Sequence, residues 1–350
     1  MRERVAGLLH RAGLLGAVLT ARKFAPIPTV SILTYHHVQD HDPSYVHDPD
    51  VADATRAQFR WQMETIARYC TPIGIDDLLR ALQGAPLPKN PVMITFDDGY
   101  RSCYEVALPI LRAIGVRATF FIATTYISDR RLYWWERVAT LLGRATKAGT
   151  VSYPTTLAID PTREDTRRLL NNTIKNTRSL DLDRFLDEVA VAVGAEWNRE
   201  IEATYANELM MTWDQIRALS RGGMDVESHS RSHRVLQTLD DDALRSELTG
   251  SREDLETQLG RPVRAIAYPV GRRIGHEPRI REALAAAGYR IGLSNNSGVN
   301  RIWPLAMAPL RKVDPFDLRR LATDREISNA MYLAQVAVPQ LAYMSTMNRD

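Results

Sequence analysis

The feature that most constrains this chain is a short apolar run that ends in two carboxylates and a glycine. Residues 92–96 are rich in β-branched and aromatic side chains and predict a buried strand, and Asp97, Asp98 and Gly99 follow it directly. Ionised carboxylates are costly to bury unless they are paired, hydrogen-bonded or bound to metal. Because ligands of parallel α/β sheets bind at the C-terminal ends of the strands, the run predicts a ligand site there. The alternative is an Asp-Gly turn in which one Asp caps the next helix.

A second strand-like run, residues 224–228, leads directly into His229 and His233. Two histidines four apart face the same way on a helical turn, and a carboxylate can complete a zinc-type set with them. The alternative is a pair of surface or helix-terminal histidines. Since both polar groups follow strand-like runs, we favour a metal site. Asp plus two His suits Zn²⁺, Co²⁺, Ni²⁺ or Fe²⁺ better than Mg²⁺ or Ca²⁺.

Residues 95–99 and 229–233 together resemble the first two motifs of the polysaccharide deacetylases of the NodB-homology type, carbohydrate esterase family 4. Weaker matches follow the family's order across residues 30–313. The opening Tyr-His strand of one subgroup resembles residues 32–38, the third motif resembles 267–271, and later landmarks resemble 288–290 and 309–311. The resemblance implies an α/β fold, a distorted (β/α) barrel of the NodB-homology type with a helical insertion.

The resemblance also implies roles for the two strand-end groups. Asp98, His229 and His233 would bind one divalent ion, with Zn²⁺ expected first and Co²⁺ or Ni²⁺ as alternatives. Asp97 would be the general base. Two adjacent acids can divide these tasks because neighbouring side chains point in different directions.

The third motif departs from the family pattern. Val270 stands where the family usually has an aromatic residue, and its backbone N–H would be the oxyanion contact. The motif's arginine would fall at Ala267. We therefore expect Arg311, in the later Pro-Leu-Arg landmark, to orient Asp97 instead.

The last motif also lacks the histidine that many relatives use as general acid. His36, at the end of the first strand, is the substitute that the subgroup suggests, and His276 is a weaker candidate. The alternative for His36 is a hydrogen bond that supports a carboxylate.

Composition sets broad limits. The 350 residues are 45% hydrophobic and 25% charged, which is ordinary for a globular protein, and the net charge of +3 gives no argument for nucleic acid. Cys70 and Cys103 are too few for a disulfide framework and fit a reducing compartment. Cys103 is expected to be a packed core thiol. We expect a cytoplasmic protein, either free or peripheral at the membrane.

The chain divides into three segments. Residues 1–28 are basic and amphipathic, too short in their apolar part to span a bilayer, and predict a helix on the domain or on an anionic membrane face. Residues 29–325 form the expected deacetylase domain, and residues 326–350 a C-terminal helix and tail. We expect a strand over 306–310 and helix from 315 onward.

A helical insertion is predicted at about residues 129–211, where the match to the family pattern lapses. It contains Tyr133, Trp134, Trp135 and Glu136 in succession. We favour a helix anchor packed on the barrel over a carbohydrate-stacking surface, because Tyr and Trp commonly bury an apolar body with a polar tip.

The leading hypothesis is a metal-dependent hydrolase that removes an N-acetyl or other small acyl group from an amino sugar. The substrate would be a polysaccharide, a glycolipid or another saccharide conjugate, and no nucleic-acid partner is expected. The competing class is a catalytically silent glycan-binding module of the same fold. Magnesium-dependent phosphoryl transfer by the two acids is a third hypothesis, but it would not need the histidine pair.

Overall fold

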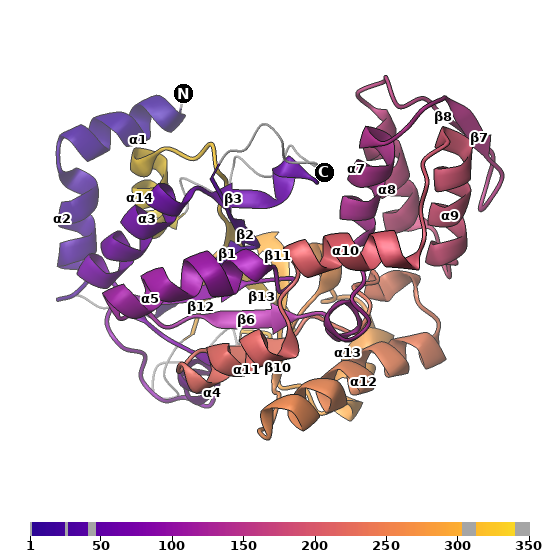
Figure 1. The fold of residues 1–350 in the computed structure, drawn as a ribbon. Coiled ribbons are helices and arrows are strands. Elements are labelled where there is room, and N and C mark those ends of the chain that lie inside the picture. Colours follow the sequence, from indigo (N-terminus) through magenta and orange to yellow (C-terminus); the bar gives the residue numbers. More distant parts are fainter. Residues whose placement is uncertain (1, 25–26, 41–46, 303–312, 340–350) are drawn as a thin grey trace.

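A computed structural model describes residues 2–24, 27–40, 47–302 and 313–339 (Figure 1). Seven parallel strands close into a barrel, because the first strand pairs with both the second and the last. In barrel order these strands are β1 (Thr29–Tyr35), β5 (Pro91–Phe96), β6 (Thr119–Ile122), β9 (Asp225–Ser228), β10 (Ala265–Ala267), β11 (Ile291–Ser297) and β13 (Leu318–Ala322). The predicted α/β class and distorted (β/α) barrel are confirmed.

The strands are apolar because both of their faces are covered. Every residue of β5 is buried, and alternate residues join different clusters: Met93 packs inside the barrel, whereas Ile94 and Phe96 pack against the outer helices. The same alternation places Thr95 and then Asp97 on the inner face, at the C-terminal mouth of the barrel. The register of one strand therefore directs the first acid into the barrel.

Helices cover the outside of the barrel (Figure 1). The outer helices are α3 (Arg56–Tyr69), the π-helical turn η2 (Cys103–Ala107) leading into α5 (Leu108–Ile114), α11 (Trp213–Arg221), α12 (Asp241–Leu259) and α13 (Pro278–Ala286). The helix α4 (Ile75–Leu82) instead packs its apolar residues against the inner cluster that contains Met93. Thr55 and Thr212 cap α3 and α11, each paired with a glutamine three residues later in a capping box. Cys103 is buried, as predicted.

Short elements complete the connections. They are β2 (His37–Val38), β3 (Ala52–Ala54), β4 (Thr71–Pro72), β12 (Asn300–Arg301), α6 (Thr124–Ser128), and the 3₁₀ turns η1 (Pro49–Val51), η3 (Leu236–Thr238) and η4 (Pro269–Gly271). The pairing of β2 with β3 ties the loop after β1 back to the barrel mouth.

The prediction of helix from residue 315 onward is wrong. Residues Leu318–Ala322 form β13, which pairs in parallel with β1 and β11 and closes the barrel. Local preference for helix in this arginine-rich stretch is overridden by pairing and burial between two strands. The expected closing helix exists, as α14 (Asn329–Ala337). The strand predicted over 306–310 lies outside the described residues.

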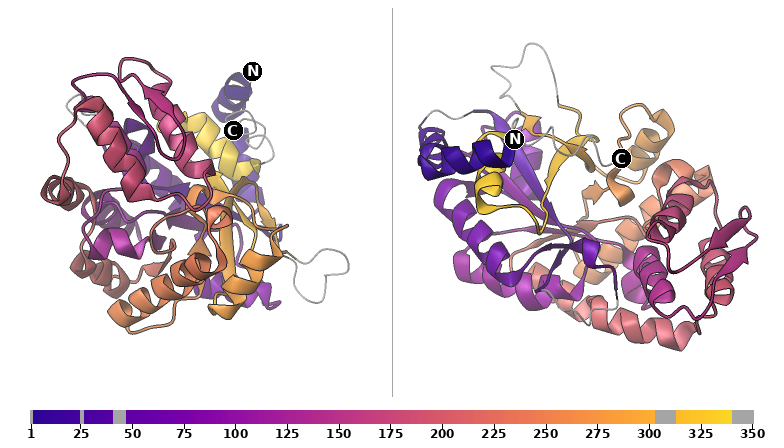
Figure 2. Two further views of the ribbon diagram at one scale, coloured as in Figure 1. Left: turned by 90° about the vertical axis from the view of Figure 1, so that its right-hand side faces the viewer. Right: turned by 90° about the horizontal axis from the view of Figure 1, so that it is seen from above.

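The insertion stands beside the barrel, on the right of Figure 1 and projecting from the barrel in Figure 2. Its elements are α7 (Trp134–Gly143), the hairpin β7 (Gly149–Val151) and β8 (Leu157–Ile159), α8 (Thr166–Asn176), α9 (Leu182–Val193) and α10 (Arg199–Leu209). The sequence predicts two helices in this interval, over residues 163–178 and 182–193, and α8 and α9 lie at these positions, with α8 shorter at both ends. Helices α7 and α10 and the hairpin were not predicted.

The N-terminal segment forms two helices, α1 (Arg2–Arg11) and α2 (Leu14–Ala21), which lie beside α14 (Figures 1 and 2). Leu15 and Leu19 are buried, and Arg22 donates to the Val336 carbonyl at 3.1 Å. Leu8 remains 61% exposed, so apolar surface is left on the outer side. Membrane contact stays a prediction. Within the described ranges, no helix combines the length and apolarity that crossing a bilayer requires.

Candidate metal centre and active site

Asp98 lies in the turn that ends β5. Its φ of 73° and that of Gly99, 85°, are left-handed, so the chain reverses sharply at the barrel mouth. Left-handed backbone is unusual for a non-glycine residue, and other contacts must hold it. Tyr133, from the start of the insertion, donates its hydroxyl hydrogen to the Asp98 carbonyl at 2.5 Å. The insertion therefore helps to hold the turn that presents Asp98.

His229 follows β9 directly. Residues of the neighbouring barrel strands hold its backbone nitrogen and its ring nitrogen Nδ1. Its backbone N–H donates to the Ile122 carbonyl at 2.9 Å, and its Nδ1 lies 2.8 Å from the Ala267 carbonyl. A carbonyl can only accept, so Nδ1 carries the proton. Nε2 is left facing Asp98, as a metal-binding imidazole requires.

His233 reaches the same point through an irregular loop. The expected helical turn over 229–233 is wrong, since Ser230 and His233 have left-handed φ values of 64° and 52°. The Glu247 carboxylate of α12 accepts backbone hydrogen bonds from Arg231 and Ser232, both at 2.8 Å. A carboxylate on a neighbouring helix thus holds the loop in the shape that aims His233 inward.

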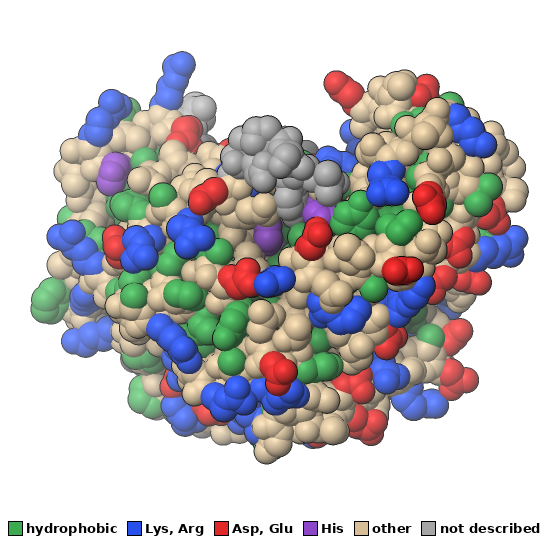
Figure 3. All heavy atoms as spheres, in the orientation of Figure 1, with side chains coloured by type: hydrophobic (Ala, Val, Ile, Leu, Met, Phe, Trp, Pro, Cys, Tyr) green, Lys and Arg blue, Asp and Glu red, His purple; other side chains and the backbone are tan. Residues whose placement is uncertain are grey.

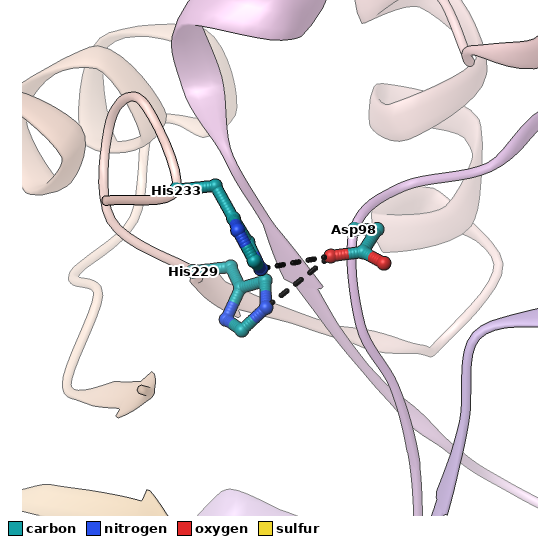
Figure 4. A group of neighbouring side chains, drawn as sticks. All are labelled: Asp98, His229 and His233. Atoms are coloured by element: carbon teal, nitrogen blue, oxygen red, sulfur yellow. Dashed lines mark ion pairs between the residues drawn. The ribbon is translucent and has the colours of Figure 1, made fainter. Parts of the chain in front are cut away.

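The three side chains converge at the barrel mouth (Figure 4). Asp98 Oδ1 lies 3.3 Å from His229 Nε2 and 3.4 Å from His233 Nε2, and one ligand atom from each residue lies within 4.8 Å of the others. All three residues are buried.

This donor set fits a small divalent cation. Asp98 Oδ1 is buried without a hydrogen-bond partner among the described residues, although two imidazole nitrogens face it. Burial, and then the neighbouring His229, lower the pKa of His233 to about 3, so this imidazole is neutral and offers a lone pair. Converging acceptor atoms repel one another unless a cation lies between them, and Asp with two His suits Zn²⁺, Co²⁺ or Ni²⁺.

Asp97 points into the barrel and pairs with an arginine that sequence reasoning missed. Arg320 Nη1 donates to Asp97 Oδ1 at 2.8 Å, and both side chains are at most 1% exposed. Burial opposes ionisation of Asp97, but Arg320 and then His229 outweigh it and hold the carboxyl pKa well below its usual range. Asp97 is therefore an ionised acceptor, and its Oδ2 lies 3.8 Å from His229 Nε2.

Arg320 makes the contact that was expected of Arg311, which lies outside the described residues. It comes from β13, the strand that was predicted as helix. An arginine on the same strand face as the buried Leu318 would have been the signal for a buried ion pair, but only once the segment was assigned to the sheet.

His36, at the end of β1, lies in the same cavity as Asp98, His229 and His233. Its Nδ1 lies 3.0 Å from Asp53 Oδ2, and its backbone N–H donates to the same oxygen. Burial disfavours the charged ring, but Asp53 outweighs burial and raises the pKa of His36 to about 9. Sequence reasoning did not identify Asp53. His276, the weaker candidate for general acid, is exposed and does not line the cavity.

The cavity over these residues has a volume of about 290 Å³. In Figure 3, histidine side chains are visible near the middle of the face that is drawn. Val270 lines the barrel side with a left-handed φ of 62°. Next to it Gly271 also has a left-handed φ, 75°, and a Cβ there would lie 2.3 Å from the Asn295 side chain, so only glycine fits this turn.

The insertion forms the opposite side of the cavity, with Trp134, Trp135 and Lys175. Trp135 Nε1 donates to the Tyr100 hydroxyl at 2.9 Å, and that hydroxyl donates to Glu136 at 2.7 Å. The rings are buried, so this aromatic group anchors the insertion to the barrel, as predicted, and also contributes wall to the cavity.

Comparison with known proteins gives the same picture. The model of the family described as Polysaccharide deacetylase matches residues 84–180 and 189–292, more than half of the chain. Among curated proteins, the poly-beta-1,6-N-acetyl-D-glucosamine N-deacetylase of Escherichia coli is 35% identical over 82 residues, which is 23% of this chain and 12% of that protein. The chain thus matches only a small part of this relative.

Solved structures resemble the chain over most of its length. The Streptococcus pyogenes deacetylase PplD covers 89% of this chain and 100% of its own, with a TM-score of 0.57 and 19% identity. IcaB from Ammonifex degensii covers 90% of this chain and 97% of its own, with a TM-score of 0.53 and 17% identity. At these identities the structural likeness establishes the fold, and the family follows from the model match: the chain belongs to the polysaccharide deacetylase family.

Proposed function

We propose that this protein is a metal-dependent N-deacetylase that hydrolyses the acetamide of an amino sugar in a polysaccharide, glycolipid or other saccharide conjugate. The observation that carries the proposal is the meeting of two groups in one cavity. Asp98, His229 and His233 offer ligand atoms to one cation, and the ionised Asp97 lies beside them without being needed as a ligand. The family and the N-deacetylases among its relatives support the same reaction class.

The proposed cation is Zn²⁺, with Co²⁺ or Ni²⁺ as alternatives, bound by Asp98 Oδ1 and the two Nε2 atoms. Bound there, it supplies Lewis-acid polarisation of a carbonyl and lowers the pKa of water. The chain's own contribution begins with Asp97, which would take a proton from the attacking water. Arg320 keeps this carboxylate ionised and fixes its direction.

The leaving amine needs a proton, and His36 is the proposed donor. With a pKa of about 9 the ring is protonated at neutral pH. Asp53 holds its Nδ1 side at 3.0 Å, which leaves Nε2 as the donating nitrogen. The Val270 backbone N–H is the proposed contact for the developing oxyanion, and its place in the cavity lining supports this role.

The test combines metal analysis with mass-spectrometric detection of deacetylated products from a panel of N-acetylated oligosaccharides. We expect one zinc or cobalt ion per chain and a mass loss of one acetyl group, with Asp97→Asn inactive but metal-loaded. Saccharide binding without product in the metal-loaded wild type would identify a glycan-binding module instead. Selective retention of magnesium would favour phosphoryl transfer.

A further inference from the structure

Lys175 is a cation at the cavity that lacks an ion-pair partner among the described residues. It lies in the last turn of α8, lines the cavity and is half-buried. Its Nζ stands 5.8 Å from the centre of the Trp134 ring, a contact of the cation–π type. Half-burial leaves the ammonium group of Lys175 accessible to a ligand in the cavity.

The acids that line the same cavity have other partners. Arg167 pairs with Asp48 at 2.6 Å and also with Asp50, and His36 pairs with Asp53. Asp97 is held by Arg320, and Asp98 belongs to the metal centre. Asp48 attracts Lys175 from a distance but already accepts two hydrogen bonds through Oδ1. Within the described part of the cavity, no carboxylate is left over for the lysine.

A second cation, Arg272, lies near Lys175, just beyond the residues that line the cavity. Arg272 follows the third motif directly after Gly271, and its Nη2 donates to Asn176 Oδ1 at 2.5 Å, one residue beyond Lys175. No carboxylate among the described residues pairs with Arg272. Burial and then the charge of Arg272 lower the pKa of Lys175. An anion that bound near both cations would be favoured by their like charge.

We propose that Lys175 and Arg272 form an anion subsite, which binds a carboxylate or phosphate carried by the saccharide next to the acetamido sugar. The subsite bridges the barrel loop after η4 and the helix α8 of the insertion. The inference that an acetamido sugar lies next to this subsite rests on the proposed deacetylase function. The ligand class is thus an acidic N-acetylated saccharide, whose anion comes from a uronate or from a phosphate ester.

The experiment compares acidic and neutral substrates of matched size. One pair is a hyaluronan tetrasaccharide and the tetramer of N-acetylglucosamine, and the other is N-acetylglucosamine 1-phosphate and N-acetylglucosamine. Acetate release is measured for wild type, Lys175→Gln, Arg272→Gln and Lys147→Gln. Lys147 is an exposed lysine of the same insertion that does not line the cavity, so it controls for lost charge alone.

Lys175→Gln should raise KM for an acidic substrate about tenfold, the value of one charge-assisted hydrogen bond, while kcat changes less than about twofold. Arg272→Gln should act in the same direction, and neither variant should alter KM for the neutral partner. Salt should weaken wild-type binding of the acidic substrate alone. The substrate pair in which the variants raise KM for the acidic member shows whether the anion is a uronate carboxylate or a phosphate ester.

Equal effects of Lys175→Gln on acidic and neutral substrates, or no effect on either pair, would overturn the subsite. If no substrate is deacetylated, the proposed function fails separately. Calorimetric binding of the same acidic saccharides to wild type and Lys175→Gln then decides the subsite, since an unchanged Kd rejects it and a tenfold weaker Kd supports it.

Discussion

The two walls of the cavity are built in different ways. On the barrel wall Asp97 and His229 are buried and each is held by a second contact: Asp97 by Arg320, and His229 by the Ala267 carbonyl. On the insertion wall, Trp134 and Trp135 offer ring surface and Lys175 offers a half-buried charge without a protein counter-ion. Among the described residues that line the cavity, the unpartnered atoms of the barrel wall, Asp98 Oδ1 and His233 Nδ1, belong to the proposed metal ligands, whereas on the insertion wall the unpartnered group is a cation.

This difference suggests a division of roles: the barrel wall would carry the reacting groups, and the insertion wall would select the substrate. Groups that move protons must be held to within fractions of an ångström, and strand ends provide such positions because their backbone is fixed by the sheet. A wall joined to the barrel through side chains can differ in its rings and charges without disturbing those groups. We therefore expect barrel-wall variants to remove the reaction and insertion-wall variants to alter which substrate is used.

The largest effect should come from the metal ligands. His233→Ala removes one of three donors and should abolish both metal retention and activity, because a two-donor remnant binds a divalent ion weakly. Metal content per chain is measured beside acetate release. His276→Ala, at an exposed position, is the control and should keep both. A metal-loaded His233→Ala protein would show that the ion is held elsewhere.

Asp97→Asn tests the barrel wall without touching the metal. The amide cannot accept a proton at neutral pH, so turnover should fall by about a thousandfold while metal stays bound. Asp242→Asn, on the exposed surface, serves as the control. Wild-type turnover in Asp97→Asn would remove this residue from the proton pathway.

Arg320→Met tests the same ion pair by removing the arginine that holds Asp97. It leaves a buried carboxylate without its partner, which costs about 3–5 kcal/mol in free energy of unfolding. The loss of Arg320 also raises the pKa of Asp97, so the acidic limb of the rate profile should move to higher pH. Chemical denaturation and a pH–rate profile measure the two effects. An unshifted acidic limb would mean that Asp97 does not set it.

The protonation of the leaving amine by His36 should depend on Asp53. A general acid must be protonated, and Asp53 keeps the pKa of His36 at about 9 despite burial. In Asp53→Asn the pKa falls, so the alkaline limb of kcat should move to lower pH by about one unit or more. His36→Ala should lower kcat about a hundredfold and abolish that limb. If the limb survives in His36→Ala, another group donates the proton.

The smallest effect is expected where the insertion supports the barrel. Tyr133→Phe removes the hydroxyl that donates to the Asp98 carbonyl and should cost about 1 kcal/mol of stability. Activity should fall only a few-fold, because the Asp98 turn keeps its β5 anchor. Tyr104→Phe, on the outer helices, is the comparison variant. A loss as large as that of Asp97→Asn would erase the distinction between the two walls.

The sequence alone determined the strand-end chemistry. Asp97 and Asp98 follow one apolar run, and His229 and His233 follow another, so the position of each group could be read from its immediate neighbours. The barrel followed from the same runs, together with the family resemblance that their motifs carry. Local order along the chain is sufficient here because parallel strands of one barrel end at one face.

Tertiary structure alone decided which charges meet. Arg320 lies 223 residues from Asp97, and a helix-like composition concealed the strand that brings them together. Asp53 joins His36 only through a loop without periodicity, and Lys175 reaches the cavity only because the insertion folds back against the barrel. Ion pairs of this kind leave no period in a sequence, since their partners are selected by three-dimensional packing and the low dielectric of the interior, not by spacing along the chain.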